Sequence, residues 1–194
     1  MANKYTVERK IRVDAPASAI YERIVDFHRW PAWSPFEELD PAMDRTYAGA
    51  ESGVGAVYEW SGNLKAGAGQ MEIVDAVDDE RVVIDQRNRK PFGSESTTTF
   101  ALDDSGDGTA VTWSITGPVT LVTRIMGIFK SMDRMVGPVF EWGLKRLKAD
   151  AEAARPSPTG ARGARDGGDD VVRGEAGDQT DQESRSASAE PHLA

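Results

Sequence analysis

The chain has 194 residues, a formal net charge of −9 and no cysteine. The lack of cysteine excludes a disulfide-stabilised fold, a catalytic thiolate and a cysteine-ligated metal centre. The negative charge argues against binding to nucleic acid, which needs a basic surface, so we expect a neutral or apolar small molecule, or another protein, as the partner.

The N-terminal residues, 1–5, lack the apolar core of a signal peptide. No apolar run reaches the ~18–20 residues that span a membrane, so we expect no integral membrane segment. Together with the absence of cysteine, this predicts a cytoplasmic protein. The sequence leaves its oligomeric state open.

A strand and a short helix are the first predicted elements. Polar and apolar side chains alternate over residues 5–13, which predicts a strand with one buried face, interrupted only by Arg9. Asp14 is placed to cap a following helix and Pro16 suits its first turn. This helix should end at or before Pro31.

Residues 26–36 follow this helix and contain two tryptophans, two phenylalanines and two prolines. The prolines exclude a long regular helix. The aromatic side chains either line the mouth of a cavity or pin the connector to the core. His28 is either part of a histidine–acid dyad or a surface histidine. The next segment, 37–44, is acidic and contains Pro41, which predicts a surface loop.

Six further strands are predicted at near-regular spacing, separated by turns rich in glycine and aspartate. This arrangement is typical of an antiparallel meander. The predicted strands are 46–47, 54–60, 70–75, 81–87, 96–102 and 109–116.

After the last strand the hydrophobic period becomes helical. Residues 119–133 are predicted to be helical, and Gly137 and Pro138 should interrupt the helix. A terminal helix, about 137–153, carries the clearest apolar stripe of the chain. Because a break between helices permits hinging, residues 119–136 are a candidate gate.

The composition shifts at residue 155 to glycine, alanine, serine, arginine and aspartate, with no aromatic side chain. Such a segment cannot bury enough apolar surface to offset the entropy of ordering. The sequence therefore predicts a folded domain, 1–154, and a disordered tail, 155–194.

Five short motifs carry a resemblance to a known family. They are IRVDAPA at 11–17, Asp26 with WPAWSP at 30–35, GVG at 53–55 leading to WSG at 60–62, GTAVTW at 108–113, and FEWGLKRLK at 140–148. In this order the sequence resembles the START-related SRPBCC superfamily, and within it the polyketide cyclase/dehydrase-like branch. The resemblance covers roughly residues 4–152.

The resemblance implies an α+β helix-grip fold. In that fold a curved antiparallel sheet of about six or seven strands wraps around a long C-terminal helix, with short helices after the first strand. An apolar cavity between sheet and helix is also implied, and members of the superfamily use it to bind lipids, sterols, polyketides or plant hormones. Some members catalyse ring closure or dehydration, but no universal catalytic motif exists to transfer.

Large apolar side chains are the candidates to line such a cavity, with ordinary core packing as the alternative for each. The candidate lining residues are Trp30, Trp33, Phe36, Tyr58, Trp60, Phe100, Trp113, Met126, Phe129, Met132 and Phe140.

Three charged residues are weak catalytic candidates: Glu72, Asp85 and Arg87. They qualify only if they face the cavity, and on the other face they are solvated surface charges. A metal site is not expected, because His28 is the single histidine of the predicted domain and no HExxH motif exists. No cofactor is predicted, since the glycines at 53 and 55 lack the third glycine of a dinucleotide site.

The leading hypothesis is a cofactor-free domain that binds a small hydrophobic or amphipathic ligand of lipid, polyketide or aromatic type. The first alternative is a cyclase or dehydratase that uses the same cavity without metal or nucleotide. The second alternative is a protein-interaction module with the tail as the recruiting segment.

Overall fold

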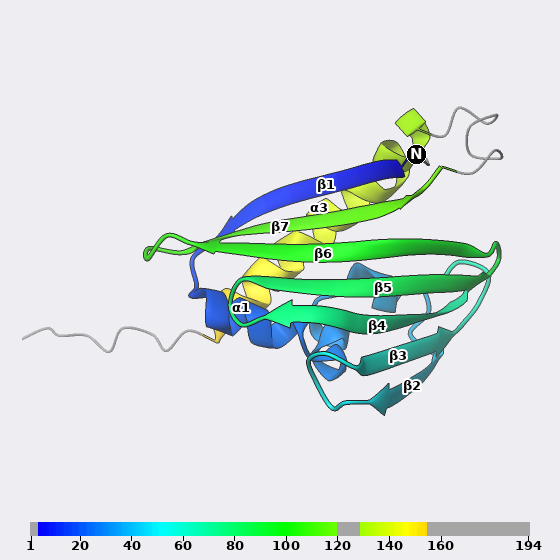
Figure 1. Cartoon of the computed structure of the whole chain (residues 1–194), viewed down its shortest axis with the longest axis horizontal. Coiled ribbons are helices and arrows are strands. Elements are labelled where there is room, and N and C mark those ends of the chain that lie inside the picture. Colours follow the sequence, from blue (N-terminus) through cyan, green and yellow to red (C-terminus); the bar gives the residue numbers. More distant parts are fainter. Residues whose placement is uncertain (1–3, 120–128, 155–194) are drawn as a thin grey trace, which may run out of the picture. The chain divides into compact units, whose positions relative to one another are not determined.

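The computed structural model of the chain describes residues 4–119 and 129–154 (Figure 1). The elements, in chain order, are β1 (Lys4–Val13), α1 (Ala17–Ile24), the 3₁₀ helices η1 (Phe27–Ala32) and η2 (Pro35–Glu38), β2 (Asp44–Gly49), β3 (Ala56–Ser61), β4 (Ala68–Val77), β5 (Arg81–Lys90), β6 (Ser94–Asp104), β7 (Thr109–Pro118) and α3 (Phe129–Ala153). The predicted tail, 155–194, lies outside the described residues, so its disorder stays a prediction.

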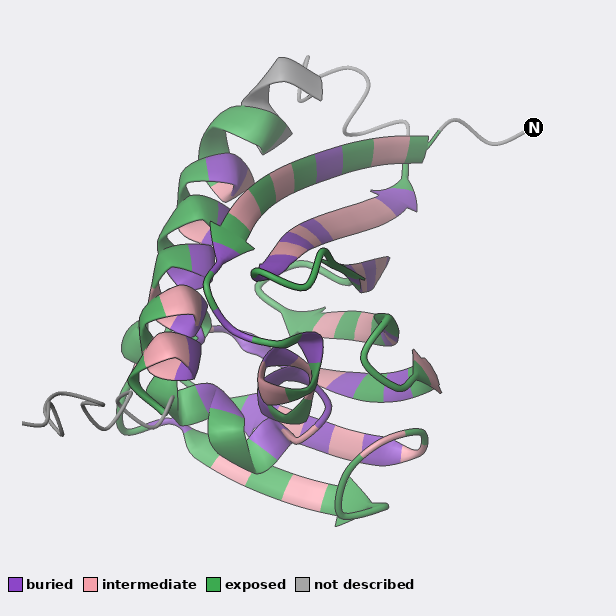
Figure 2. Cartoon of the chain, turned by 90° about the vertical axis from the view of Figure 1, so that its left-hand side faces the viewer, coloured by how far each residue is buried: buried purple, intermediate pink, exposed green. Residues whose placement is uncertain are grey.

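All seven strands form one antiparallel sheet in the order β1-β7-β6-β5-β4-β3-β2. Strands β2 to β7 are a continuous meander, and β1 pairs with the last of them. The sheet is curved, and α3 runs along its concave side (Figure 2). The predicted helix-grip architecture, an α+β fold with a sheet gripping the terminal helix, is confirmed.

Each strand presents alternate residues to the concave face, because successive side chains point to opposite sides of a sheet. In β6, for example, Ser96, Thr98 and Phe100 are buried, whereas Thr97 and Thr99 between them are partly exposed. The single interruption expected in β1 is also present, since Arg9 lies in phase with the buried positions of that strand.

The helix α3 corrects the prediction of a break at Gly137 and Pro138. It continues through both residues, although Pro138 lacks the N–H that would bond to the carbonyl one turn earlier. Arg9 lies against the helix at Gly137, donating to Asp133 (2.8 Å) one turn before it and to Glu141 (2.8 Å) one turn after it. The break on which the candidate gate depended is therefore absent, and residues 120–128 of that gate lie outside the described residues.

The start of the first helix also differs from the prediction. Pro16 is the N-cap of α1, without a side-chain cap bond, so Asp14 does not cap this helix. The backbone N–H of Asp14 instead donates to Glu152 Oε1 at 2.7 Å, which ties this turn to the end of α3. The helix ends at Ile24, and the chain continues towards Pro31 as a 3₁₀ turn.

The third strand begins later than predicted. Val54 precedes β3 in a turn and is 57% exposed. Its neighbours Gly53 and Gly55 have φ angles of 75° and 87°, which only glycine adopts readily, so the backbone here cannot be extended.

The aromatic connector folds as the two 3₁₀ helices, with Pro31 inside η1 and Pro35 opening η2. The indole N–H of Trp30 donates to the carbonyl of Ile24 (3.0 Å), and that of Trp33 to the carbonyl of Arg23 (3.1 Å). These bonds fix the connector to the last turn of α1.

Candidate functional site

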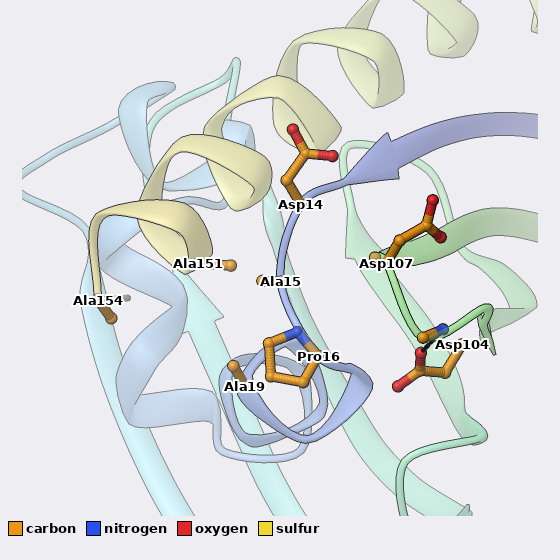
Figure 3. A pocket seen from close by; sticks show the side chains of 10 residues that line it. Asp14, Ala15, Pro16, Ala19, Asp104, Asp107, Ala151 and Ala154 are labelled. Atoms are coloured by element: carbon orange, nitrogen blue, oxygen red, sulfur yellow. Dashed lines mark hydrogen bonds between the residues drawn. The ribbon is translucent and has the colours of Figure 1, made fainter. Parts of the chain in front are cut away.

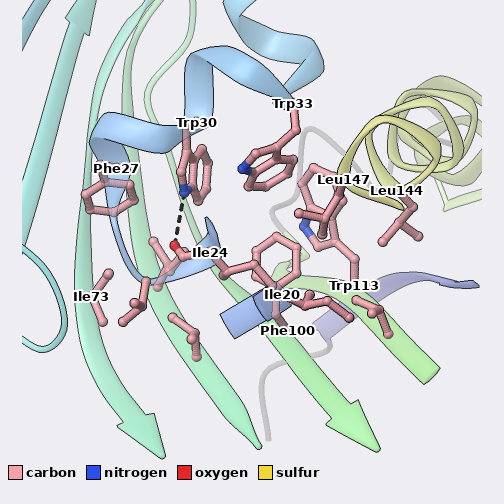
Figure 4. Packing of buried hydrophobic residues seen from close by; sticks show 14 of the residues in the cluster. Ile20, Ile24, Phe27, Trp30, Trp33, Ile73, Phe100, Trp113, Leu144 and Leu147 are labelled. Carbon is pink, nitrogen blue, oxygen red and sulfur yellow. Dashed lines mark hydrogen bonds between the residues drawn. The ribbon is translucent and has the colours of Figure 1, made fainter. Parts of the chain in front are cut away.

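An aromatic cluster fills the middle of the concave face (Figure 4). Trp33 of η1 lies with its ring centroid 6.0 Å from Phe100 and 5.9 Å from Trp113. Phe140 of α3 stacks on Trp113 at 4.1 Å, and Trp30 closes the cluster 5.0 Å from Trp33. All five side chains are buried, so they pack against one another rather than surround open space at this point.

The other candidate lining residues lie around this cluster or outside the described part. Tyr58 and Trp60 of β3 are buried and stacked, 6.0 Å apart. Phe36 of η2 is 41% exposed and lies 6.3 Å from Trp113, at the margin of the cluster. Met126 lies outside the described residues, as do the side chains of Phe129 and Met132.

Beyond the aromatic cluster, the concave face becomes polar. We call Gln86, Asn88, Ser96 and Thr98 the polar patch. Gln86 lies directly opposite Ser96 on the neighbouring strand, and its amide donates to Asn88 Oδ1 at 3.0 Å. Apolar side chains border the patch: Ile84 and Ile115 lie opposite Thr98, and Met71 lies opposite Gln86.

Two residues of the polar patch, Ser96 and Thr98, are largely buried. Ser96 is 8% exposed and Thr98 is 4% exposed. Within residues 4–119 and 129–154, neither hydroxyl has a hydrogen-bond partner. Among the described residues, the fully buried side-chain atoms without a partner are Ser34 Oγ and Trp113 Nε1, so the oxygens of Ser96 and Thr98 keep some accessible surface, from which they can pair with water or a ligand. Polar groups among apolar side chains suit an amphipathic molecule.

The alternation of β6 placed Ser96 and Thr98 in phase with Phe100, so their inward orientation was readable from the sequence. They were not among the predicted site residues, because the candidate lining residues were selected as large apolar side chains and these two are small and polar.

A buried carboxylate, Glu37, corrects the prediction that 37–44 is wholly a surface loop. Its side chain accepts a hydrogen bond from Tyr58 Oη (2.7 Å) and one from Arg45 Nε (2.7 Å). Burial, and then the bond to Glu37, raise the pKa of Tyr58 well above its ordinary value. The carboxylate is satisfied by two partners, so it joins η2 to β2 and β3 and is not available to a ligand.

The weak catalytic candidates lie on the outer face of the sheet, where all three are exposed. Asp85 lies directly opposite Glu72 and accepts a hydrogen bond from Thr97 (2.9 Å). Arg87 is 3.7 Å from the carboxylate of Glu95. The sequence analysis predicted that these three residues are solvated surface charges if they lie on the face away from the cavity, and the structure places them on that face.

His28 lies at the surface, away from the polar patch. Its Nδ1 is 3.0 Å from Asp26 Oδ1, and its ring stacks on Tyr47 at 4.1 Å. A histidine–acid pair therefore exists, but half of the His28 side chain is exposed. In the described part of the chain, no three metal-binding side chains are grouped to hold an ion.

A hollow of about 520 Å³ lies between the start of α1, the β6–β7 turn and the end of α3 (Figure 3). Alanines, glycines and Pro16 line most of it, together with Asp14, Asp104 and Asp107. Asp104 accepts bonds from the backbone N–H groups of Gly106 and Ala17, and Asp107 pairs with Arg12. The hollow contains none of the predicted site residues, and the carboxylates of Asp104 and Asp107 are already engaged.

Residues 4–152 match the family described as polyketide cyclase / dehydrase and lipid transport. The chain belongs to this family. The match spans the whole sheet and nearly all of α3, so the family assignment rests on the same elements that form the concave face.

Solved structures share the fold of this family member at low identity. Protein CV1439 from Chromobacterium violaceum aligns with a TM-score of 0.55 and 15% identity, over 76% of this chain and 96% of that chain. StfQ, a di-domain ARO/CYC protein of the steffimycin biosynthetic pathway, aligns with a TM-score of 0.60 and 14% identity, over 77% of this chain and 51% of that one. Ara h 8.0201 aligns with a TM-score of 0.52 and 12% identity, over 78% and 99% of the two chains.

A search of curated proteins found no match to this family member. Among its described helices, none has the length and apolar character needed to cross a membrane.

Proposed function

We propose that the chain binds one small hydrophobic or amphipathic molecule, of lipid, polyketide or aromatic type, on the concave face between the sheet and α3. The observation that carries the proposal is the pair of largely buried residues, Ser96 and Thr98, whose hydroxyls have no partner in the described part of the chain and keep some accessible surface, on a face that would otherwise be expected to be apolar. The family description, which includes lipid transport, supports the same class of ligand.

Burial of apolar surface supplies the affinity in this proposal, at ~25 cal/mol for each Å² removed from water. The polar patch supplies orientation, because a carbonyl, hydroxyl or carboxyl group of the ligand can pair with Gln86, Ser96 or Thr98. The apolar part of the ligand then lies along Ile115 and Met71, which border the patch. The aromatic cluster limits how far the ligand extends towards α1.

Native mass spectrometry tests the proposal, with palmitic acid and the anthraquinone emodin as probes of the lipid and aromatic polyketide classes. We expect wild-type protein to retain one molecule of at least one probe. Thr98→Val removes the hydroxyl and keeps the side-chain shape, so it should weaken binding about tenfold, the effect of losing one hydrogen bond of about 1.4 kcal/mol.

The matched control is Thr99→Val, which makes the same change on the outer face of the same strand. It should leave probe binding unchanged. Failure of wild-type protein to retain either probe, or equal losses in the two variants, would count against a ligand on the concave face.

A cyclase or dehydratase would need an acid or base beside the ligand. The polar patch contains no ionisable side chain, and the three weak candidates are exposed on the outer face. We therefore propose binding, and not catalysis, as the function of this face.

A further inference from the structure

Two loops lie side by side at one end of the sheet. One is the β3–β4 loop, 62–67, and the other is the turn at 91–93 between β5 and β6. A side chain at Gly67 would place its Cβ 2.4 Å from the carbonyl oxygen of Lys90 and 3.5 Å from Pro91, so the loops are in contact. Both extend from the same end of the paired strands β4 and β5, the right-hand end in Figure 1.

Each loop carries one large apolar side chain in solvent. Leu64 is 91% exposed and Phe92 is 82% exposed, which makes them the most exposed large apolar residues of the described chain. Phe36, by comparison, is 41% exposed and lies against Trp113 at the margin of the aromatic cluster. Exposed apolar groups that gather at adjoining tips are typical of an interaction surface.

The same two tips also carry one lysine each. Lys65 follows Leu64, and Lys90 lies two residues before Phe92. Within the described residues, neither lysine forms an ion pair with a carboxylate, whereas the neighbouring Arg89 pairs with Glu59 at 3.3 Å. One carboxylate bonds to the β3–β4 loop, since Asp40 accepts from the backbone N–H of Asn63 (2.7 Å), so the two lysines outnumber the acid at these tips on a chain whose net charge is −9.

We propose that Leu64, Lys65, Lys90 and Phe92, here called the tip surface, dock on an anionic lipid bilayer. The apolar side chains insert among the acyl chains, and the two lysines contact the headgroup phosphates, the pattern of an interfacial anchor. Two protruding side chains suit a soft bilayer surface better than a protein partner, because a stable protein interface buries about 800 Å² on each side.

The tip surface also adjoins the concave face. Asn88 of the polar patch lies two residues before Lys90, and its amide donates to Ser94, two residues after Phe92 (2.9 Å). Docking through the tips would bring the polar end of the concave face close to the membrane. The proposal concerns a different surface from the ligand site, so either can fail without the other.

Vesicle flotation without added ligand tests the proposal. The vesicles are phosphatidylcholine alone, or phosphatidylcholine with about one fifth phosphatidylserine. Wild-type protein should float with the anionic vesicles and bind the neutral ones more weakly. The double variant Leu64→Ser/Phe92→Ser should bind the anionic vesicles at least tenfold more weakly, and Lys65→Glu/Lys90→Glu should lose the preference for phosphatidylserine.

The controls make the same chemical changes elsewhere. Val54→Ser replaces an exposed apolar residue in the β2–β3 turn, and Lys145→Glu reverses an exposed charge on α3. Both should bind vesicles like wild type. The tip variants should also retain palmitic acid or emodin as wild type does, which separates this proposal from the ligand site.

Absence of wild-type flotation with anionic vesicles would overturn the proposal, as would equal flotation of Leu64→Ser/Phe92→Ser and wild type. Saturable binding of an acidic protein that the tip variants lose, in the absence of vesicle binding, would also overturn it and would assign the tip surface to a protein partner.

Discussion

The guanidinium group of Arg9 occupies the space that a side chain at Gly137 would need: an added Cβ would lie 2.0 Å from Arg9 Nη2. Asp133, Gly137 and Glu141 follow one another at intervals of one helical turn, so they share a face of α3. Arg9 crosses the glycine and bonds to the two acids. Gly137 therefore makes room for a strand residue, and does not end the helix.

Replacing Gly137 by alanine should have different effects on stability in two backgrounds. In a helix interior, alanine is favoured over glycine by about 1 kcal/mol. In the wild type this gain should be offset, because the Cβ displaces Arg9 from both carboxylates. In an Arg9→Met background the contact is already absent, so Gly137→Ala should stabilise the protein by about 1 kcal/mol. Urea unfolding of the four proteins measures this coupling.

The expected coupling energy is about 1 kcal/mol, and equal effects of Gly137→Ala in the two backgrounds would show that Arg9 and Gly137 are independent.

The buried Glu37 depends on the hydroxyl of Tyr58. Tyr58→Phe removes a hydrogen bond to a charged acceptor and should lower the free energy of unfolding by about 1.5–3 kcal/mol. Tyr47→Phe is the matched control, since the Tyr47 ring lies 5.3 Å from Tyr58 but its hydroxyl has no bonding partner among the described residues. It should change stability by less than about 0.5 kcal/mol. Thermal or urea unfolding of both variants tests this prediction. Similar losses of stability in Tyr58→Phe and Tyr47→Phe would contradict a stabilising role for the Tyr58 hydroxyl.

The free energy of unfolding should decrease at alkaline pH because Tyr21 ionises. Burial, and then its hydrogen bond to Asp78 (3.0 Å), raise the pKa of Tyr21 to about 12 from a model-peptide value near 10. Between these values the folded state binds more protons than the unfolded state, so stability decreases as pH rises. The stabilising contribution of protonated Tyr21 is fully present below about pH 10 and is lost as the pH rises through about 12.

Urea midpoints of wild type and Tyr21→Phe, measured from about pH 8 to pH 11, test this prediction. The variant should be less stable at pH 8 and should show a shallower decline above pH 10. Tyr58, whose pKa is also raised, contributes to the decline of both proteins, so the difference between them isolates Tyr21. Parallel curves would contradict the assignment.

Local patterns in the sequence were enough to predict most strands and the terminal helix, and the resemblance to a known family supplied their arrangement. The alternation through 96–102 predicted strand β6, and the stripe through 137–153 predicted the helix that the sheet grips. Neither inference needs a partner from elsewhere in the chain, because the periods of strands and helices are properties of the local backbone.

The predictions that failed depend on residues far apart in the sequence. Gly137 and Pro138 together predict a break, and the sequence does not show that Arg9, from the first strand, lies against Gly137. Glu37 resembles a surface acid until β2 and β3 bring Arg45 and Tyr58 to it. Long-range pairing of this kind leaves no periodic signal, so sequence patterns cannot reveal it.

The central claim is that the polar half of the concave face holds a ligand, and Ser96→Phe tests it most directly. A phenyl ring at this inward position should fill the proposed site, whereas Thr99→Phe adds the same ring to the outer face. Titration calorimetry with the probe that wild type retains should show binding to wild type and Thr99→Phe, and none to Ser96→Phe, with Ser96→Phe still folded. Undiminished binding to a folded Ser96→Phe protein would contradict the account.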